Sequence, residues 1–257
     1  MDFEDEKFIK MEQSDDFLFE AYEEPVKSKA IKLAKKALEI NHDNIDAENF
    51  ITKFESNTTK KLEKYKETLD KEQTRLEKDN IFSKENIGIF WGLIETRPYM
   101  RTKHCYTLTL IELGRYTEAI QQGEEMLKLC ENDNQGIRYL IMGLYAVLEK
   151  FEECEKIYKK YKDDSTFMLF PLSIMYYKKG DYKKTKKILK EIQQNNEYIL
   201  EYLKQKIKFT KTKINNIEEE GTYSWGSEAE AYFVVKDYKY LLGTVPKFVE
   251  FIERAIK

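Results

Sequence analysis

The sequence contains few of the residues that break helices or support special chemistry. Its 257 residues include only ten Gly and four Pro. So few turn-forming residues argue against many short strands and indicate helices joined by short connections. The two His and three Cys are scattered, without a paired C-x-x-C spacing, at positions 42, 104, 105, 130 and 154. We therefore expect no metal site, no cofactor and no cysteine chemistry.

Long apolar runs and a large net charge are also absent. The longest stretch without charge, Ser165 to Tyr177, is too short to span a bilayer. An odd number of thiols without a signal peptide suits a reducing compartment, so we expect a cytoplasmic protein. The formal net charge of -3 gives no general attraction to nucleic acid or to anionic membranes. We therefore expect neither of these as the partner.

Charged and aromatic residues are abundant instead, at 35% and 14% of the chain. Long amphipathic helices with solvated charged faces and ring-filled seams produce this balance. The composition therefore predicts an all-α protein that does no catalysis, because no Gly-rich phosphate loop and no distinctive pair of carboxylates is present.

One short pattern recurs between amphipathic stretches. A turn followed by an aromatic ring is found at Gly114-Arg115-Tyr116, Glu149-Lys150-Phe151 and Gly180-Asp181-Tyr182, at intervals of 35 and 31 residues. Each ring is followed three residues later by a small or β-branched residue, namely Ala119, Cys154 and Thr185. A repeat near 34 residues made of two helices is typical of a stacked helical solenoid.

The pattern predicts one solenoid over residues 1–257. Within it we expect an N-terminal repeat with a charged helical arm at 1–85, core repeats at 86–210 and C-terminal capping helices at 211–257. The arm contains a long charged helix at about 57–79, with a thin apolar seam that suits a surface helix. The polar stretch 211–226 is expected to interrupt the helices before a capping box at Ser227-Glu228-Ala229-Glu230.

The repeats resemble tetratricopeptide repeats. Gly114-Arg115-Tyr116 with Ala119 and Ile120, and Gly180-Asp181-Tyr182 with Ile188 and Leu189, match second-helix positions of that consensus. The resemblance implies a right-handed α-solenoid of helical hairpins whose first helices line a concave groove. Pro171 falls inside one expected first helix, where a kink or a late start is expected.

A closer resemblance covers most of the chain from about Ser14. The blocks Phe90-Trp91-Gly92-Leu93, Glu95 to Arg101, Asn132 to Tyr139 and Gly226 to Ala231 are similar to those of a bacterial tetratricopeptide family. That family is in turn similar to the eukaryotic suppression-of-tumorigenicity-7 proteins. The resemblance implies an adaptor that binds a partner protein or peptide, rather than an enzyme.

Two sets of candidate site residues follow. The first is a polar cluster made of Arg97, Arg101, Asp133, Asn134, Gln135 and Arg138. It could bind a carboxylate, phosphate or peptide, or it could fix the register of the repeats through pairs with Glu95 and Asp133. The second set is expected to line the groove, and includes His104, Tyr139, Phe170 and Tyr177.

The groove admits several occupants. Its aromatic lining suits an apolar or helical peptide or a helix of the same chain, and the rings could equally pack between helices or under the C-terminal segment. A nucleotide- or anion-sensing role for the arginines is the first alternative function. The second is RNA binding by the lysine-rich run Lys178 to Lys190.

Overall fold

The computed structural model describes residues 3–256, in which helices are the only regular elements apart from two isolated bridges involving Gly88, Ile89 and Cys130. The all-α prediction is confirmed. The contacts divide the chain into two compact units, one ending at Ile137 and one beginning at Arg138. Among the residues described, no helix combines the length and the apolar character that crossing a membrane requires.

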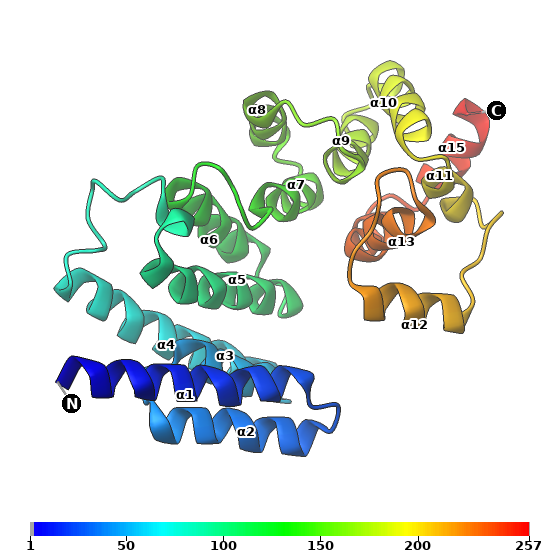
Figure 1. Ribbon diagram of the computed structural model, residues 1–257. Helices are drawn as coiled ribbons and strands as arrows, with labels where there is room; N and C mark the ends of the chain where they lie inside the picture. Colours follow the sequence, from blue (N-terminus) through cyan, green and yellow to red (C-terminus); the bar gives the residue numbers. More distant parts are fainter. Residues whose placement is uncertain (1–2, 257) are drawn as a thin grey trace. The chain divides into compact units, whose positions relative to one another are not determined.

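The first unit contains six α-helices and two short 3-10 turns in its described part (Figure 1). In chain order they are α1 (Phe3–Glu23), α2 (Lys27–Ile40), α3 (Ile45–Lys53), α4 (Thr58–Lys78), η1 (Phe90–Gly92), η2 (Ile94–Thr96), α5 (Arg97–Glu112) and α6 (Tyr116–Leu129).

Small side chains bring the first helices close together. Ala30, Ala34 and Ala37 of α2 are buried, and they form one cluster with Ala21 of α1 and Phe50 of α3. Alanine leaves the helix backbones close enough for the larger neighbours to fill the remaining space. In Figure 1, α1 and α2 run side by side along their length.

The charged helix α4 is docked by one narrow seam. Leu62, Tyr65, Leu69 and Leu76 are buried, whereas most of the intervening charged residues face solvent. The helix packs mainly against α5 and also contacts α3. It therefore belongs to the core of the first unit over most of its length, with its charge kept on the outer side.

The second unit contains the remaining helices, which continue in chain order from residue 137. They are α7 (Ile137–Val147), α8 (Phe151–Tyr161), α9 (Thr166–Lys178), α10 (Tyr182–Asn195), α11 (Glu197–Leu203), α12 (Lys211–Glu220), α13 (Glu228–Asp237), α14 (Lys239–Leu242) and α15 (Phe248–Ala255). Helix α9 is the centre of this unit, since every residue from Thr166 to Tyr176 is buried.

The expectation that the polar stretch 211–226 interrupts the helices was wrong. The polar stretch 211–226 contains α12, whose buried residue Ile217 anchors it and whose N-cap Thr210 accepts from the N–H of Lys213. Helix α11 ends at Leu203, although apolar residues continue to Phe209, because Gln205 adopts a left-handed backbone with φ of 56°. In contrast, Ser227 caps α13 as expected, by accepting from the N–H of Glu230.

The three recurring turns share one backbone geometry. Gly114, Glu149 and Gly180 all have positive φ, at 71°, 56° and 77°. The N–H of each following residue donates to the carbonyl five residues before it, at 2.9 to 3.0 Å. These are the bonds of a Schellman turn, which ends a helix and reverses the chain. Ala119, Cys154 and Thr185, three residues after the rings, are fully buried.

Candidate functional site

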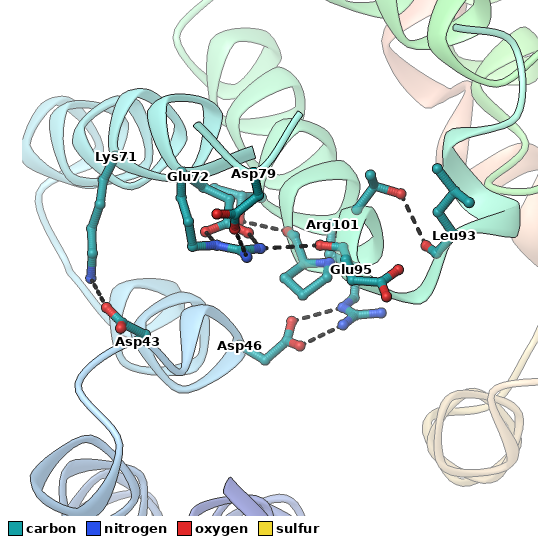
Figure 2. A network of polar contacts seen from close by, with 12 residues as sticks. Asp43, Asp46, Lys71, Glu72, Asp79, Leu93, Glu95 and Arg101 are labelled. Atoms are coloured by element: carbon teal, nitrogen blue, oxygen red, sulfur yellow. Dashed lines mark hydrogen bonds and ion pairs between the residues drawn. The ribbon is translucent and has the colours of Figure 1, made fainter. Parts of the chain in front are cut away.

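A two-pronged ion pair joins α3 to α5 in the first unit. Arg101 donates from Nε and Nη2 to the two carboxylate oxygens of Asp46, at 2.7 and 2.5 Å. Asp46 lies in the first turn of α3, which Asn44 caps by accepting from the N–H of Ala47. Figure 2 shows the guanidinium and the carboxylate facing each other. Because the two hydrogen bonds require one relative position of the side chains, the pair restricts the register of α5 against α3.

The Arg101 side chain still reaches solvent. It is 41% exposed, and Tyr22 of α1 is close enough to interact with it electrostatically. Tyr22 is exposed although its ring meets Phe50 edge-on at 4.9 Å between centroids. Leu108, two turns beyond Arg101 on α5, is exposed as well. We call Tyr22, Arg101 and Leu108 the open face.

His104 lies between Arg101 and Leu108 on α5 and is partly buried. Burial lowers the pKa of its imidazole, and burial raises the pKa of the neighbouring Cys105 thiol. Both groups are therefore neutral near pH 7, so they supply no thiolate and no imidazolium. Among the described residues, no group of His, Cys, Asp and Glu is arranged to hold a metal ion.

The carboxylate of Glu95 is not the partner of Arg101. The backbone carbonyl of Glu95 accepts instead from Nη2 of Arg75, at 3.4 Å. The same guanidinium binds the buried Glu72, at 2.5 Å from Nη2 to Oε1, and Asp79 at 3.3 Å. This second network ties the end of α4 to the segment that precedes α5, and it has a structural role.

The Arg97 side chain contacts Trp91, which lies six residues earlier in the sequence. Its Nε donates to the carbonyl of Trp91 at 3.0 Å, and its guanidinium lies 5.8 Å from the centre of the Trp91 ring. Thr96 donates its hydroxyl to the carbonyls of Phe90 and Leu93. The blocks at 90–93 and 95–101 therefore fold onto each other and build the start of α5.

Asp133, Asn134 and Gln135 shape the loop before α7. Asp133 has a φ of 49°, and its Oδ1 accepts from the N–H of Ile137 at 2.7 Å. The Asp133 carboxylate thus caps α7 from four residues before its first residue, Ile137. Asn134 accepts from the thiol of Cys130 at 3.2 Å, and Gln135 donates to the carbonyl of Met100 at 3.4 Å.

Arg138 and Tyr139 belong to the second unit and share one carboxylate there. Nε of Arg138 lies 3.0 Å from Oδ2 of Asp163, and the Tyr139 hydroxyl donates to the same oxygen at 2.8 Å. Burial alone would raise the pKa of Asp163, but hydrogen bonds from the Ser165 N–H, Tyr139 and Arg138 outweigh it and lower the pKa. The carboxylate is therefore ionised and paired.

The expected groove residues of the second unit are covered by the C-terminal helices. The Tyr238 ring lies 5.9 Å from that of Phe170, and its hydroxyl lies 2.8 Å from the backbone carbonyls of Tyr139 and Phe167. Tyr177 packs against Phe248 and Phe251 of α15, with centroids 5.1 and 5.2 Å apart.

Gly143 allows Tyr238 and Tyr240 of the C-terminal segment to pack closely against α7. A side chain at this position of α7 would begin 2.2 Å from the hydroxyl of Tyr240 and 2.9 Å from the ring of Tyr238. Only glycine leaves the space that these rings occupy. The aromatic lining in this unit thus has an intramolecular occupant, which was one of the interpretations open from the sequence.

Sequence reasoning missed the carboxylates that organise each unit. Asp46 and Asp163 are short acidic residues near helix starts, and nothing in their surroundings distinguishes them from other such residues. Glu230 had a signal, because it is the second acid of the capping box. It is fully buried and accepts from Thr166 Oγ1, Asn196 Nδ2 and the Gly226 N–H, at 2.5, 2.9 and 2.6 Å.

These contacts divide the predicted site residues into two groups. Arg97, Asp133, Asn134 and Gln135 stabilise loops of the first unit, and Tyr139, Phe170 and Tyr177 lie under or beside covered surfaces of the second. Arg101 alone combines a firm ion pair with exposure among apolar neighbours. The chain matches no protein-family model and no curated protein sequence.

Proposed function

We propose that the protein is a non-catalytic adaptor of the cytoplasm, built from tetratricopeptide-like helix pairs, that binds a partner protein or peptide. The pairs would be α1 with α2, α3 with α4, α5 with α6, α7 with α8 and α9 with α10. The common Schellman geometry of the turns at Gly114, Glu149 and Gly180 supports this assignment, because a repeat reuses one way of reversing the chain.

The open face is the proposed binding surface. The observation that carries this assignment is the exposure of Tyr22 and Leu108 beside the oriented Arg101 guanidinium. Tyrosine and arginine at the centre of a surface are the residues most often responsible for binding energy in protein interfaces. In the second unit the comparable aromatic residues are already covered by helices of the same chain, so we assign partner binding to the first unit.

Binding of a free anion is less well supported. Asp46 occupies the Nε–Nη2 edge of Arg101, and Asp163 pairs with Arg138. A phosphate or carboxylate ligand would have to compete with a carboxylate that is already in place. Binding of RNA has no specific support either, since Lys184 and Lys187 of α10 have acidic neighbours Asp181 and Glu191 at 3.7 and 3.6 Å.

Affinity capture with matched variants tests the proposal. The wild-type chain is used as bait in an extract of its native host, beside the double variant Tyr22→Ala/Leu108→Glu, with quantitative mass spectrometry as readout. Tyr182→Ala, another exposed tyrosine, is the control. We expect one or more proteins to be captured by the wild type and the control and to be lost by at least about tenfold with the double variant.

Circular dichroism must show that all three chains stay folded at the temperature of the capture, because Tyr22→Ala removes a ring contact with Phe50 and Tyr182→Ala removes ring contacts with Tyr177 and Phe251. Capture of the same proteins by the double variant would contradict the assignment to the open face.

A further inference from the structure

Helix α1 has two apolar faces. One of them, including Leu18 and Ala21, is buried against α2. The other consists of Phe8, Met11, Phe19 and Tyr22, and all four side chains are exposed, Phe19 at 67% and Phe8 at 60%. Their spacing of three, eight and three residues places them on one line along the helix, with Asp15 in the gap. We call these four residues the outer stripe.

No described part of the chain buries the outer stripe, because all four of its side chains are exposed. Exposed apolar patches of this kind mark surfaces that another molecule covers. The regular spacing of the outer stripe matches the spacing with which an amphipathic helix presents its own anchors.

From Glu12 onward, the residues of α1 beside the outer stripe are acidic, whereas Lys7 and Lys10 flank Phe8 in the sequence. Arg101, the cation near Tyr22, is already paired with Asp46. Between Met11 and Val26 the chain has six acidic residues and no Lys or Arg. Glu12, Asp16, Glu20 and Glu23 are exposed along one edge of the stripe. Helix α2 has several lysines, but the one directed at α1, Lys36, lies over the ring of Phe17, on the side of α1 away from the stripe.

Asp15 provides a fixed negative charge within the stripe. Its Oδ1 accepts from Nδ2 of Asn44 at 3.0 Å, which orients the carboxylate. Partial burial raises the pKa of this carboxyl, and the neighbouring carboxylates of Asp46 and Asp16 raise it further. A cation bound here would relieve both effects.

We propose that the outer stripe of α1 docks a cationic amphipathic helix of a partner protein. Apolar residues of that helix would pack on Phe8, Met11, Phe19 and Tyr22, and its lysines or arginines would pair with Asp15 and the acidic edge. The proposal rests on the partner-binding function proposed above and names the class of partner, since Tyr22 belongs both to the stripe and to the open face.

A second copy of the chain fits the stripe poorly. An α1 helix from another copy would bring its own acidic edge against this one, and like charges would face each other. The exposed lysines of α2 come without exposed apolar neighbours on that helix, because Ala30, Ala34 and Ala37 face the core. Neither α1 nor α2 of a second copy therefore supplies the positive charge and the apolar stripe together, which favours a different protein as the occupant.

Two synthetic peptides test this directly with the full-length chain. Both are helices of about 18 residues with leucines at the same helical spacing, one with lysine and the other with glutamate at all polar positions. Fluorescence anisotropy at about 0.15 M salt measures their binding, so that long-range attraction is screened. We expect the Leu/Lys peptide to bind at least about tenfold more tightly than the Leu/Glu peptide.

Variants locate the binding. We expect Phe19→Ser and, separately, Asp16→Lys/Glu20→Lys to weaken the Leu/Lys peptide by about tenfold or more. Trp225→Ser, which removes an equally exposed ring from the second unit, is expected to leave binding unchanged. Equal binding of both peptides, or equal binding to wild type and Phe19→Ser, would overturn the proposal. So would a wild-type dimer in sedimentation velocity that Phe19→Ser converts to monomer.

The peptide-binding experiment and the capture experiment can fail independently of each other. If no peptide binds while the open-face variant still loses its captured partner, the protein is an adaptor and the class of partner proposed here is wrong. If the peptide binds at the stripe and capture does not depend on the open face, the stripe is a docking site and the assignment of the open face fails.

Discussion

At the scale of single residues, Tyr238 compensates for a defect that Pro171 creates. Proline has no N–H, so Pro171 cannot donate to the carbonyl of Phe167, four residues earlier in α9. The hydroxyl of the buried Tyr238 reaches that carbonyl at 2.8 Å, and its one proton is shared with the carbonyl of Tyr139 at the same distance. Helix α9 therefore continues through Pro171 without interruption, where the sequence suggested a kink or a late start.

A double-mutant cycle measures this compensation. We expect Tyr238→Phe to lower the free energy of unfolding by about 1–3 kcal/mol, because a buried carbonyl loses its donor. In the Pro171→Ala variant, the new N–H at position 171 can donate to the Phe167 carbonyl. In that background we expect Tyr238→Phe to lower the free energy of unfolding by at least about 0.5 kcal/mol less than in the wild type. Chemical denaturation of the four chains gives both values. Equal costs in the two backgrounds would show that the hydroxyl does not replace the missing donor.

The Asp163 carboxyl predicts a pH dependence of stability. Its pKa is lower in the folded protein than in the unfolded chain, so its stabilising contribution is complete above the unfolded value. That contribution is lost as the pH falls through the folded value. We expect Asp163→Asn to lower stability at pH 7 by about 1–3 kcal/mol, since Arg138 and Tyr139 lose a charged acceptor.

The difference between wild type and Asp163→Asn should shrink progressively below about pH 4, where the wild-type carboxyl becomes protonated. Denaturation curves at a series of pH values check this. A difference that stays constant down to about pH 2 would rule out ionisation of Asp163 as the source of the stabilisation.

At the scale of elements, the backbone geometry of the three recurring turns predicts how substitutions at positions 114, 149 and 180 change stability. Glu149 adopts the left-handed conformation that glycine adopts at 114 and 180, and a residue with a Cβ is strained there by about 1–2 kcal/mol. We expect Glu149→Gly to stabilise the protein by about 1 kcal/mol, and Gly114→Ala or Gly180→Ala to destabilise it by a similar amount. Thermal denaturation monitored by circular dichroism compares the three variants.

The Glu149 side chain lies 3.8 Å from Nζ of Lys178 and is 61% exposed, so losing that pair should cost little. The variant Glu149→Ala, which removes the pair and keeps the Cβ, is the control. If Glu149→Gly is no more stable than Glu149→Ala, the turn at 149 does not impose the strain inferred from its backbone.

The sequence could predict elements whose signals are local. Pro98 at the start of α5, the cap at Ser227 and the apolar seam of α4 are examples, since each depends on a few neighbouring residues. It could not predict α12, because a polar decapeptide becomes helical here only through its cap and one buried isoleucine. The start of α7 lacks a local signal of this kind, because its cap Asp133 lies four residues before the first helical residue.

The contacts at the site join residues that are distant in sequence, so the sequence could not predict them. Arg101 pairs with Asp46, 55 residues away, and the Tyr238 hydroxyl contacts Tyr139, 99 residues away. No periodicity links such positions, so the sequence could name Arg101, Arg138 and Tyr139 as unusual without saying what they bind. Once these carboxylates and carbonyls are assigned, most of the polar cluster has a structural role.

At the scale of the whole molecule, the two units differ in what their first helices present. The aromatic residues of α7 and α9 are covered by Tyr238 and by α15, and these contacts complete the second unit. In the first unit, Tyr22, Arg101 and Leu108 remain exposed, as does the outer stripe of α1. We therefore assign partner binding to the first unit. In the second unit, helices of the same chain already cover the comparable aromatic residues.

Hydrogen–deuterium exchange on the complex with a captured partner tests this claim most directly. The account predicts that partner binding slows exchange in α1 and α5 while exchange in α9, α10 and α15 stays unchanged. Protection confined to α9 or to the lysine-rich α10, with none in α1 and α5, would contradict it.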